Sequence, residues 1–211
     1  MKKLLTILFC FISLTFHAVA AEQAEVEKFA KDLADDIIKN VVLAKVPLQQ
    51  KQDAFRKSFL AAINLKTTAR FTLGRYAKTA QPEQLQAYTD ALADNIACAW
   101  ANRFNDYAGG ALSPDIVSFV STRQNENGDF YVTSKLKLPN SENDIEMIWR
   151  VSDKKGKLKL ADLIVEGVSM LISYRNEYTA ILQQNGGDIA ALTEMLEKKN
   201  AALKKTSGES A

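Results

Sequence analysis

Hydrophobic residues recur every three or four positions through most of the first half of the chain, with charged residues between them. In the first such segment the apolar positions are Val26, Phe29, Leu33, Ile37 and Val41. This spacing places them on one face of an amphipathic helix, which we expect to end before Pro47. The same spacing predicts a second helix that contains residues 55–63 and a third over about residues 65–77.

Two glycine pairs divide the remaining helical segments. A long helix is predicted to begin at Pro82, since proline is tolerated in the first helical turn, and to end at Gly109-Gly110. Its apolar stripe consists of Leu85, Tyr88, Leu92, Ile96, Trp100 and Phe104. The helical period returns after Gly167, and Gly186-Gly187 separates two more helices. Asp188 is placed to cap the second of these through its carboxylate.

Between the two helical regions the period of the pattern falls to two, which is typical of half-buried strands. Four strands are predicted, over about residues 115–125, 129–138, 144–153 and 157–165. Asn127-Gly128 is a strong signal for a hairpin turn, and short connections allow only antiparallel neighbours. The expected fold class is therefore α+β, with a four-stranded twisted antiparallel sheet packed against several helices.

One face of this sheet and the helices opposite it would enclose an apolar space. The residues expected on its walls are Phe71, Leu73, Tyr76, Ile116, Val120, Phe130, Val132, Leu136, Ile145, Met147, Trp149, Val151, Leu171 and Tyr174. The pattern is the same whether that space holds side chains or a ligand, so a filled core and an apolar pocket both remain open. Met147 and Trp149 favour a pocket, because large or flexible side chains adapt to a variable ligand.

The first twenty residues differ from the rest of the chain. Lys2 and Lys3 precede an apolar run from Leu4 to Phe16, and Ala18-Val19-Ala20 has the A-x-A form of a cleavage site. This pattern predicts a secretory signal peptide at residues 1–20 and an exported single domain at residues 21–211. No later stretch approaches the roughly 20 apolar residues of a transmembrane helix, so we expect no membrane anchor.

Removal of this leader changes the available chemistry. His17 is the only histidine, so the mature chain is expected to lack Ser-His-Asp catalysis, Cys-His catalysis and His-ligated metal sites. The 27 Lys and Arg residues exceed the 25 Asp and Glu residues only by Lys2 and Lys3, which leaves the mature chain formally neutral and nucleic acid a poor partner. Cys98 is then unpaired, and we expect it to be buried. No metal or cofactor is predicted.

Several stretches of the mature chain closely resemble the MlaC family. They are Arg70-Phe71-Thr72-Leu73-Gly74-Arg75-Tyr76, Pro82-Glu83-Gln84, Asp162-Leu163-Ile164-Val165-Glu166-Gly167-Val168-Ser169-Met170 and Arg175-Asn176-Glu177-Tyr178. Members are periplasmic phospholipid carriers, also described as toluene-tolerance auxiliary proteins, and the order and spacing agree over nearly the whole mature chain. Gln81 stands where the family usually has Ser or Thr, and Leu158 stands where it often has Trp. Loss of that aromatic residue on the sheet would alter the pocket.

The resemblance implies a carrier that encloses phospholipid acyl chains in a deep apolar pocket. It also implies exchange of lipid between an inner-membrane ABC transporter and an outer-membrane complex of a lipoprotein and a porin, in support of outer-membrane lipid asymmetry. We expect a monomer without catalytic residues. A related branch lies beside genes of hopanoid synthesis, so a hopanoid or another polycyclic lipid is an alternative cargo.

Three arginines within the matching stretches are candidates for binding a lipid phosphate. A guanidinium bonds a phosphate through paired hydrogen bonds, and these candidates are Arg70, Arg75 and Arg175. The alternative is that they form structural ion pairs with Asp162, Glu166 or Glu177.

Two functions outside the carrier class remain open at this point. A buried Asp162 beside Tyr174 would suit a small lipid-modifying enzyme that uses the carboxylate as an acid or base. An adaptor with a filled core would act only through its surface. The volume of the pocket separates the adaptor from the other classes.

Overall fold

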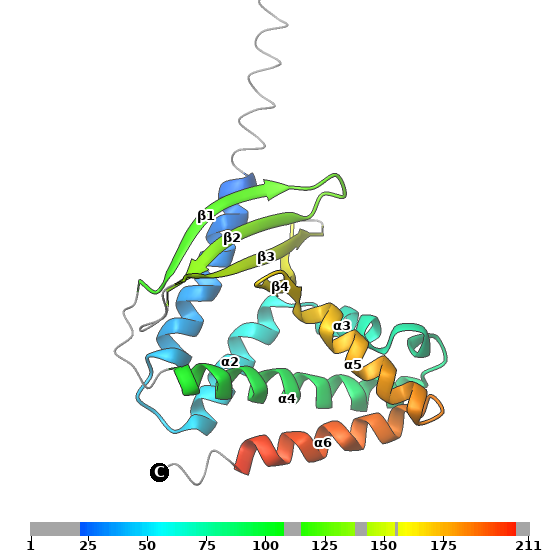
Figure 1. The fold of residues 1–211 in the computed structure, drawn as a ribbon. Coiled ribbons are helices and arrows are strands. Elements are labelled where there is room, and N and C mark those ends of the chain that lie inside the picture. The colour runs from blue at the N-terminus through cyan, green and yellow to red at the C-terminus, as the bar shows by residue number, and fades with distance from the viewer. Residues whose placement is uncertain (1–21, 108–114, 138–142, 155, 206–211) are drawn as a thin grey trace, which may run out of the picture.

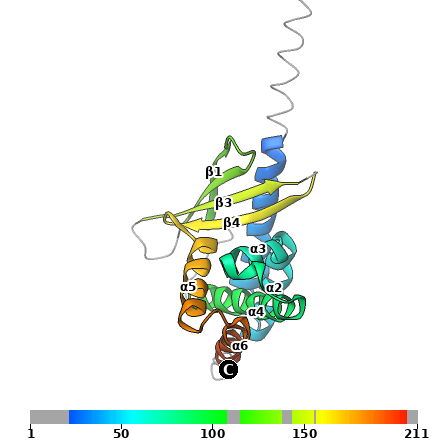
Figure 2. The same ribbon diagram turned by 90° about the vertical axis from the view of Figure 1, so that its right-hand side faces the viewer.

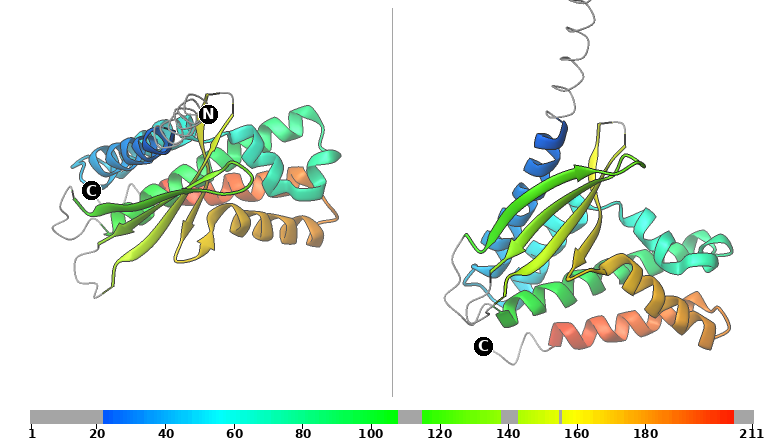
Figure 3. Two further views of the ribbon diagram at one scale, coloured as in Figure 1. Left: turned by 90° about the horizontal axis from the view of Figure 1, so that it is seen from above. Right: turned by 45° about the horizontal axis from the view of Figure 1, so that its top comes forward.

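The structure is a computed structural model that describes residues 22–107, 115–137, 143–154 and 156–205. It confirms the α+β class, with an antiparallel sheet and helices packed against it (Figure 1). In the view from above, the N-terminal helix runs along one side of the sheet and α5 lies on the other side (Figure 3).

The sheet is a meander in which each strand pairs with the next one along the chain. Its strands are β1 (Val117–Gln124), β2 (Phe130–Leu136), β3 (Ile145–Asp153), β4 (Leu158–Val165) and β5 (Val168–Ser169). The four long strands agree with the prediction, and β5 is a small addition. It follows a tight turn in which Glu166 and Gly167 have φ angles of 49° and 77°. A strand of two residues is too short to show alternation, so the sequence pattern missed it.

The helices also follow the predicted order. They are the N-terminal helix (22–37), which continues as the π-helical turn η1 (Ile38–Val42), then α2 (Leu48–Ala62), α3 (Leu65–Leu73), the 3₁₀ helix η2 (Gly74–Lys78), α4 (Pro82–Tyr107), α5 (Met170–Gln184) and α6 (Ile189–Lys205). The third predicted helix is divided, because Gly74 has a φ of 57° and ends α3. Asp188 caps α6 as predicted, since its Oδ1 accepts the backbone N–H groups of Ala190 and Ala191 at 2.8 and 3.2 Å. The predicted stop at 109–110 lies outside the described residues.

Helix α4 occupies the centre of the helical layer, between α2 and α6 (Figure 2). Buried amides connect it to its neighbours. Asn95 donates to Asn200 Oδ1 at 2.9 Å, and Asn200 donates to the carbonyl of Ala91 at 2.9 Å. Tyr178 of α5 donates to Asn95 at 3.3 Å. Because buried polar groups need partners, these bonds fix how α4, α5 and α6 pack on one another.

Cys98 of α4 is 2% exposed, which confirms the prediction that it is buried. Burial also raises the pKa of its thiol. Because the thiolate is the reactive form of cysteine, both effects make Cys98 unreactive.

The expectation that Val120 faces the helices is wrong. Phe119 pairs with Ser134 and Ser121 pairs with the adjacent Thr133, so Val120 is an extra residue in β1. Such a β-bulge breaks the alternation of faces along a strand. Val120 is consequently 57% exposed.

Candidate ligand-binding site

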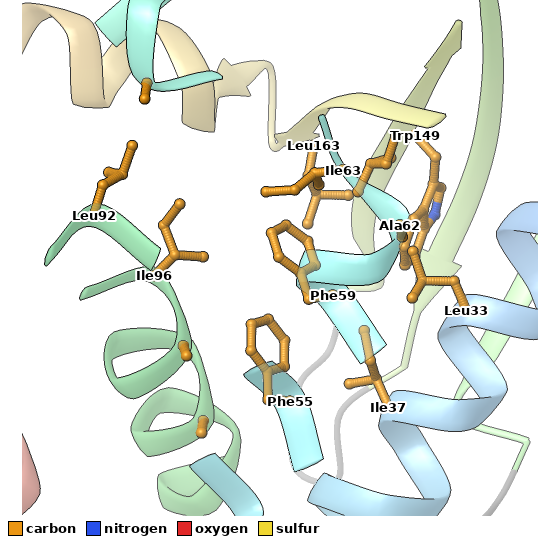
Figure 4. Packing of buried hydrophobic residues seen from close by; sticks show 14 of the residues in the cluster. Leu33, Ile37, Phe55, Phe59, Ala62, Ile63, Leu92, Ile96, Trp149 and Leu163 are labelled. Atoms are coloured by element: carbon orange, nitrogen blue, oxygen red, sulfur yellow. The ribbon is translucent and has the colours of Figure 1, made fainter. Parts of the chain in front are cut away.

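An apolar cavity of about 60 Å³, here called the inner cavity, lies between the N-terminal helix, α2, α4 and the sheet. Its lining consists of Ala34, Ile37, Ile38, Val42, Phe55, Phe59, Trp100, Phe104, Ile116, Val117, Leu136, Met147, Trp149 and Leu163. Figure 4 shows Phe59 between Phe55 and the sheet residue Leu163, and the rings of Phe55 and Phe59 stack with centroids 5.0 Å apart. The inner cavity is far smaller than the roughly 300–1,000 Å³ of common ligand pockets, so an acyl chain requires it to widen.

A second cavity of about 450 Å³, here called the outer cavity, lies between α4, α5 and the sheet. It is lined by Trp100, Arg103, Phe104, Leu136, Ile145, Met147, Val165, Val168, Met170, Ser173, Tyr174 and Glu177. Most of the wall is apolar, while Arg103, Ser173 and Glu177 add charged and hydroxyl groups. This mixture of an apolar wall and a few polar groups is typical of a site for an amphiphilic small molecule.

Four side chains separate the two cavities. Trp100, Phe104, Leu136 and Met147 line both of them and are called the partition below. The rings of Trp100 and Phe104 have centroids 5.9 Å apart. Because the partition consists of side chains, rotamer changes alone can alter the connection between the cavities.

The two tryptophans of the site differ in their hydrogen bonding. The Nε1 of Trp149 donates to Ser134 Oγ at 2.9 Å, and Ser134 is fully buried on the same face of the sheet. This bond holds the Trp149 ring against the inner cavity. The Nε1 of Trp100 is also shielded from solvent, but it has no hydrogen-bond partner among the described residues.

Six of the fourteen residues expected on the apolar walls line one or both of these cavities. They are Ile116, Leu136, Ile145, Met147, Trp149 and Tyr174. Four others, Leu73, Phe130, Val132 and Val151, are buried in the core away from both cavities. The bulge turns Val120 outward, as described above.

The last three expected wall residues lie elsewhere in the fold. Phe71 and Leu171 line a separate cavity of about 430 Å³ beside β4, whose wall includes Arg150 and Lys159. Tyr76 packs beneath the turn between α5 and α6, where a Cβ placed on Gly187 would come within 2.9 Å of its ring. Tyr76 therefore supports packing between elements, whereas Phe71 and Leu171 border a cavity other than the two described above.

The helices supply most of the inner wall, through residues that were not among those expected on the apolar walls. They include Ala34, Ile37, Ile38 and Val42 near the N-terminus, Phe55 and Phe59 on α2, and Trp100 and Phe104 on α4. A signal was present in the aromatic pairs spaced four residues apart, Phe55 with Phe59 and Trp100 with Phe104. Such pairs lie on one helix face, and a ring contact at 5.9 Å joins the two pairs through Phe55 and Phe104.

The three predicted phosphate-binding arginines line neither cavity. Arg75 lies over the Tyr76 ring at 5.0 Å, Arg175 lies over the Phe71 ring at 4.7 Å, and Arg70 is exposed. The ion pairs found within the described part of the chain do not include any of the three. The cation at the outer cavity is Arg103, which lies over the Trp100 ring at 5.2 Å.

Asp162 has a structural environment. Its Oδ1 accepts the backbone N–H of Leu171 at 3.0 Å, and its Oδ2 accepts the hydroxyl of Ser169. Ser169 Oγ in turn accepts the N–H of Ile172 at 3.0 Å and caps α5. Both carboxylate oxygens are thus used to hold the start of α5 against β4, and Asp162 lines neither cavity.

Tyr174 forms part of the outer wall and stacks on Tyr178 with ring centroids 5.6 Å apart. Burial raises the pKa of both phenols, so each stays protonated near neutrality.

Among the described residues, no three His, Cys, Asp or Glu side chains are grouped as a metal site would require. Within the same residues, none of the helices has the length and apolar character needed to cross a bilayer.

The fold and cavities together define an α+β binding protein, with apolar space between one face of a meander sheet and its helices. The family model described as MlaC protein matches residues 27–198, and the chain therefore belongs to the MlaC family. The family is periplasmic in general. The fold also resembles the structure of a phospholipid-binding protein from Ralstonia solanacearum in complex with a phospholipid, with a TM-score of 0.71 and 20% identity. That match covers 85% of this chain and 98% of the other.

Proposed function

We propose that this protein is a periplasmic carrier that encloses the acyl chains of a phospholipid and moves the lipid between the two membranes. The observation that carries the proposal is the pair of adjoining apolar cavities, one with polar groups in its wall, in a chain of the MlaC family. The Ralstonia relative, which is described as phospholipid-binding, supports the class of ligand.

Enclosure of the acyl chains lowers the main free-energy barrier to lipid transfer through water. A diacyl lipid exposes about 30 methylenes to water, each unfavourable by about 0.8 kcal/mol, which gives a barrier on the order of 20 kcal/mol. An apolar cavity replaces water with side chains of similar polarity to the bilayer. Loading and unloading then come close to thermoneutral, so a docking partner needs to supply little energy to set the direction.

The two cavities divide the lipid between them in this proposal. The outer cavity takes the glycerol and phosphate region, and the acyl chains extend past the partition into a widened inner cavity. Arg103 is the phosphate contact in place of Arg70, Arg75 and Arg175, because it alone among these lines the outer cavity. Glu177, which pairs with Lys199 at 3.3 Å, lies at the same cavity and disfavours a headgroup with further negative charge.

A pair of arginine variants tests this placement. Arg103→Gln should weaken retention of a phospholipid by several-fold, since a charge-assisted bond is worth about 1.5–3 kcal/mol when desolvated and less at an exposed mouth. Arg75→Gln is the matched control and should retain lipid normally. If both variants retain the same amount of fluorescent phospholipid in a vesicle-pelleting assay, Arg103 is not part of the site.

The proposed route has two ends. Lipid is exchanged with an inner-membrane ABC transporter and with an outer-membrane complex of a lipoprotein and a porin, and this exchange maintains outer-membrane lipid asymmetry. The protein acts as a monomer after removal of residues 1–20. The family membership and the leader sequence support this route.

The carrier performs no covalent chemistry in this proposal. The Asp162 carboxylate, which was the strongest candidate for a catalytic group, is occupied by the start of α5. A polycyclic lipid such as a hopanoid is the alternative cargo, because a rigid ring system would fit a broad outer cavity without entering the inner one. A bound lipid of either kind would exclude an adaptor with a filled core.

The decisive experiment is native mass spectrometry of the protein purified from its own periplasm, followed by extraction of the bound molecule. A stoichiometric diacyl phospholipid is the expected result. A hopanoid would assign the protein to the polycyclic branch. Repeated gentle preparations without lipid would contradict the carrier and favour the adaptor.

A further inference from the structure

The indole N–H of Trp100 is a buried donor without a partner among the described residues. An unpaired buried donor is unfavourable by about 1–3 kcal/mol, and such groups are rare in native structures. The chain has 2 tryptophans, and both line the inner cavity. Trp149 has its Nε1 bonded to Ser134, so the unpaired donor is not a general property of tryptophan in this cavity.

The donor lies close to the Tyr174 hydroxyl. Trp100 lines both cavities, whereas Tyr174 lines the outer one and not the inner one. Burial raises the pKa of Tyr174, and the nearby Trp100 indole opposes that rise by lowering it. The approach falls outside hydrogen-bonding geometry. Nε1 is therefore next to a group of the outer cavity, at the boundary with the apolar inner cavity.

We propose that Trp100 Nε1 donates a hydrogen bond to an ester carbonyl of the bound lipid, which makes it a specificity-determining contact for ester-linked glycerolipids. The inference rests on the proposed carrier function and adds the chemical class of the cargo. It follows from the order of groups along the site: Arg103 and Glu177 in the outer wall, then the Trp100 donor, then an inner wall made only of apolar residues. A glycerolipid has the same order of phosphate, ester carbonyl and acyl chain.

The same order argues against cargo without a carbonyl. A polycyclic hydrocarbon would fill the apolar space but leave the Trp100 donor unpaired, and an ether-linked lipid would offer it only a weakly accepting ether oxygen in place of a carbonyl. A site that buries a donor discriminates against ligands that lack the matching acceptor, because the donor loses water and gains no partner. The expected preference for the ester is about 3- to 10-fold, in line with one neutral hydrogen bond.

The test compares two lipids that differ only at this bond. Delipidated protein is loaded with a diester phosphatidylcholine or with the diether analogue of the same chain length, and retention is measured by competition against a fluorescent phospholipid. Wild-type protein should prefer the diester. Trp100→Phe keeps an aromatic ring but has no N–H, so it should remove the preference by weakening diester binding. Trp149→Phe is the matched control: it changes the inner wall and lowers the affinity for both lipids alike, so it should keep the preference.

Two further measurements separate the hydrogen bond from a packing effect. Tyr174→Phe removes the hydroxyl beside the indole, so the diester preference should persist if the lipid is the acceptor. In wild-type protein the Trp100 indole N–H resonance should move downfield with the diester and not with the diether. This second measurement needs no variant and stands even if Trp100→Phe fails to fold.

The outcomes test the ester contact and the carrier function separately. Equal affinity of wild-type protein for both lipids, or an unmoved Trp100 resonance on diester binding, would overturn the ester contact and leave the carrier intact. Loss of the preference in Tyr174→Phe would assign the discrimination to Tyr174 and overturn the role of Trp100. Failure of wild-type protein to bind either lipid would overturn the carrier function and the ester contact together.

Discussion

Replacing Asp162 distinguishes a structural carboxylate from a catalytic one. In Asp162→Ala the hydroxyl of Ser169 and the backbone N–H of Leu171 both lose their acceptor at the start of α5. Loss of a helix cap destabilises by about 1 kcal/mol, and a buried unpaired donor adds about 1–3 kcal/mol. We therefore expect the free energy of unfolding to fall by about 2–4 kcal/mol. Asp162→Asn keeps one acceptor oxygen and should lose about half as much.

Urea unfolding followed by circular dichroism measures this difference, and a lipid-retention assay on the same preparations tests function. Because Asp162 lines neither cavity, folded Asp162→Asn should retain phospholipid as wild-type protein does. Ser169→Ala, which removes the hydroxyl shared by Asp162 and Ile172, serves as the structural control. The reasoning fails if Asp162→Asn keeps wild-type stability while it loses lipid binding or a measurable turnover of lipid.

Three further predictions concern other parts of the fold. Burial raises the pKa of Tyr178, so above pH 10 its phenol ionises in the unfolded chain but stays protonated in the folded one. Between pH 8 and pH 11 the free energy of unfolding measured in urea should therefore fall by about 1.4 kcal/mol more for wild-type protein than for Tyr178→Phe. Gly187→Ala combines a φ of 84° with a Cβ 2.9 Å from the Tyr76 ring and should lower the melting temperature more than Gly186→Ala, whose Cβ meets nothing within 4 Å. Ala34→Phe should fill the inner cavity, destabilise by about 1–3 kcal/mol and reduce the lipid retained per protein in native mass spectrometry; normal lipid content would show that the inner cavity takes no acyl chain.

The alternation of apolar residues was enough to predict the layers of the fold. Phe130, Val132 and Val151 alternate with polar neighbours and are all fully buried against the helices. The same period could not reveal the bulge in β1, because the extra residue there is a valine that looks like any other inward position. Only pairing with β2 shows that Val120 is the inserted residue.

The candidate site was less predictable for a different physical reason. A helix that borders a cavity and a helix that borders a filled core have the same apolar stripe, so Phe55 and Phe104 looked like ordinary core residues. Cation placement depends on tertiary structure as well. Arg75 and Arg175 cover nearby aromatic rings, whereas Arg103, which no motif marked, lies at the outer cavity.

The bulge in β1 also bears on how the protein avoids association with itself. β1 is the end strand of the sheet, and an end strand offers unpaired backbone groups on which another chain can add a strand. The extra residue at Val120 interrupts the regular row of these groups midway along the strand. Arg123 adds an exposed positive charge on the same strand, which further opposes strand addition. A small irregularity in pairing thus makes the end strand a poor template for a second copy of the chain.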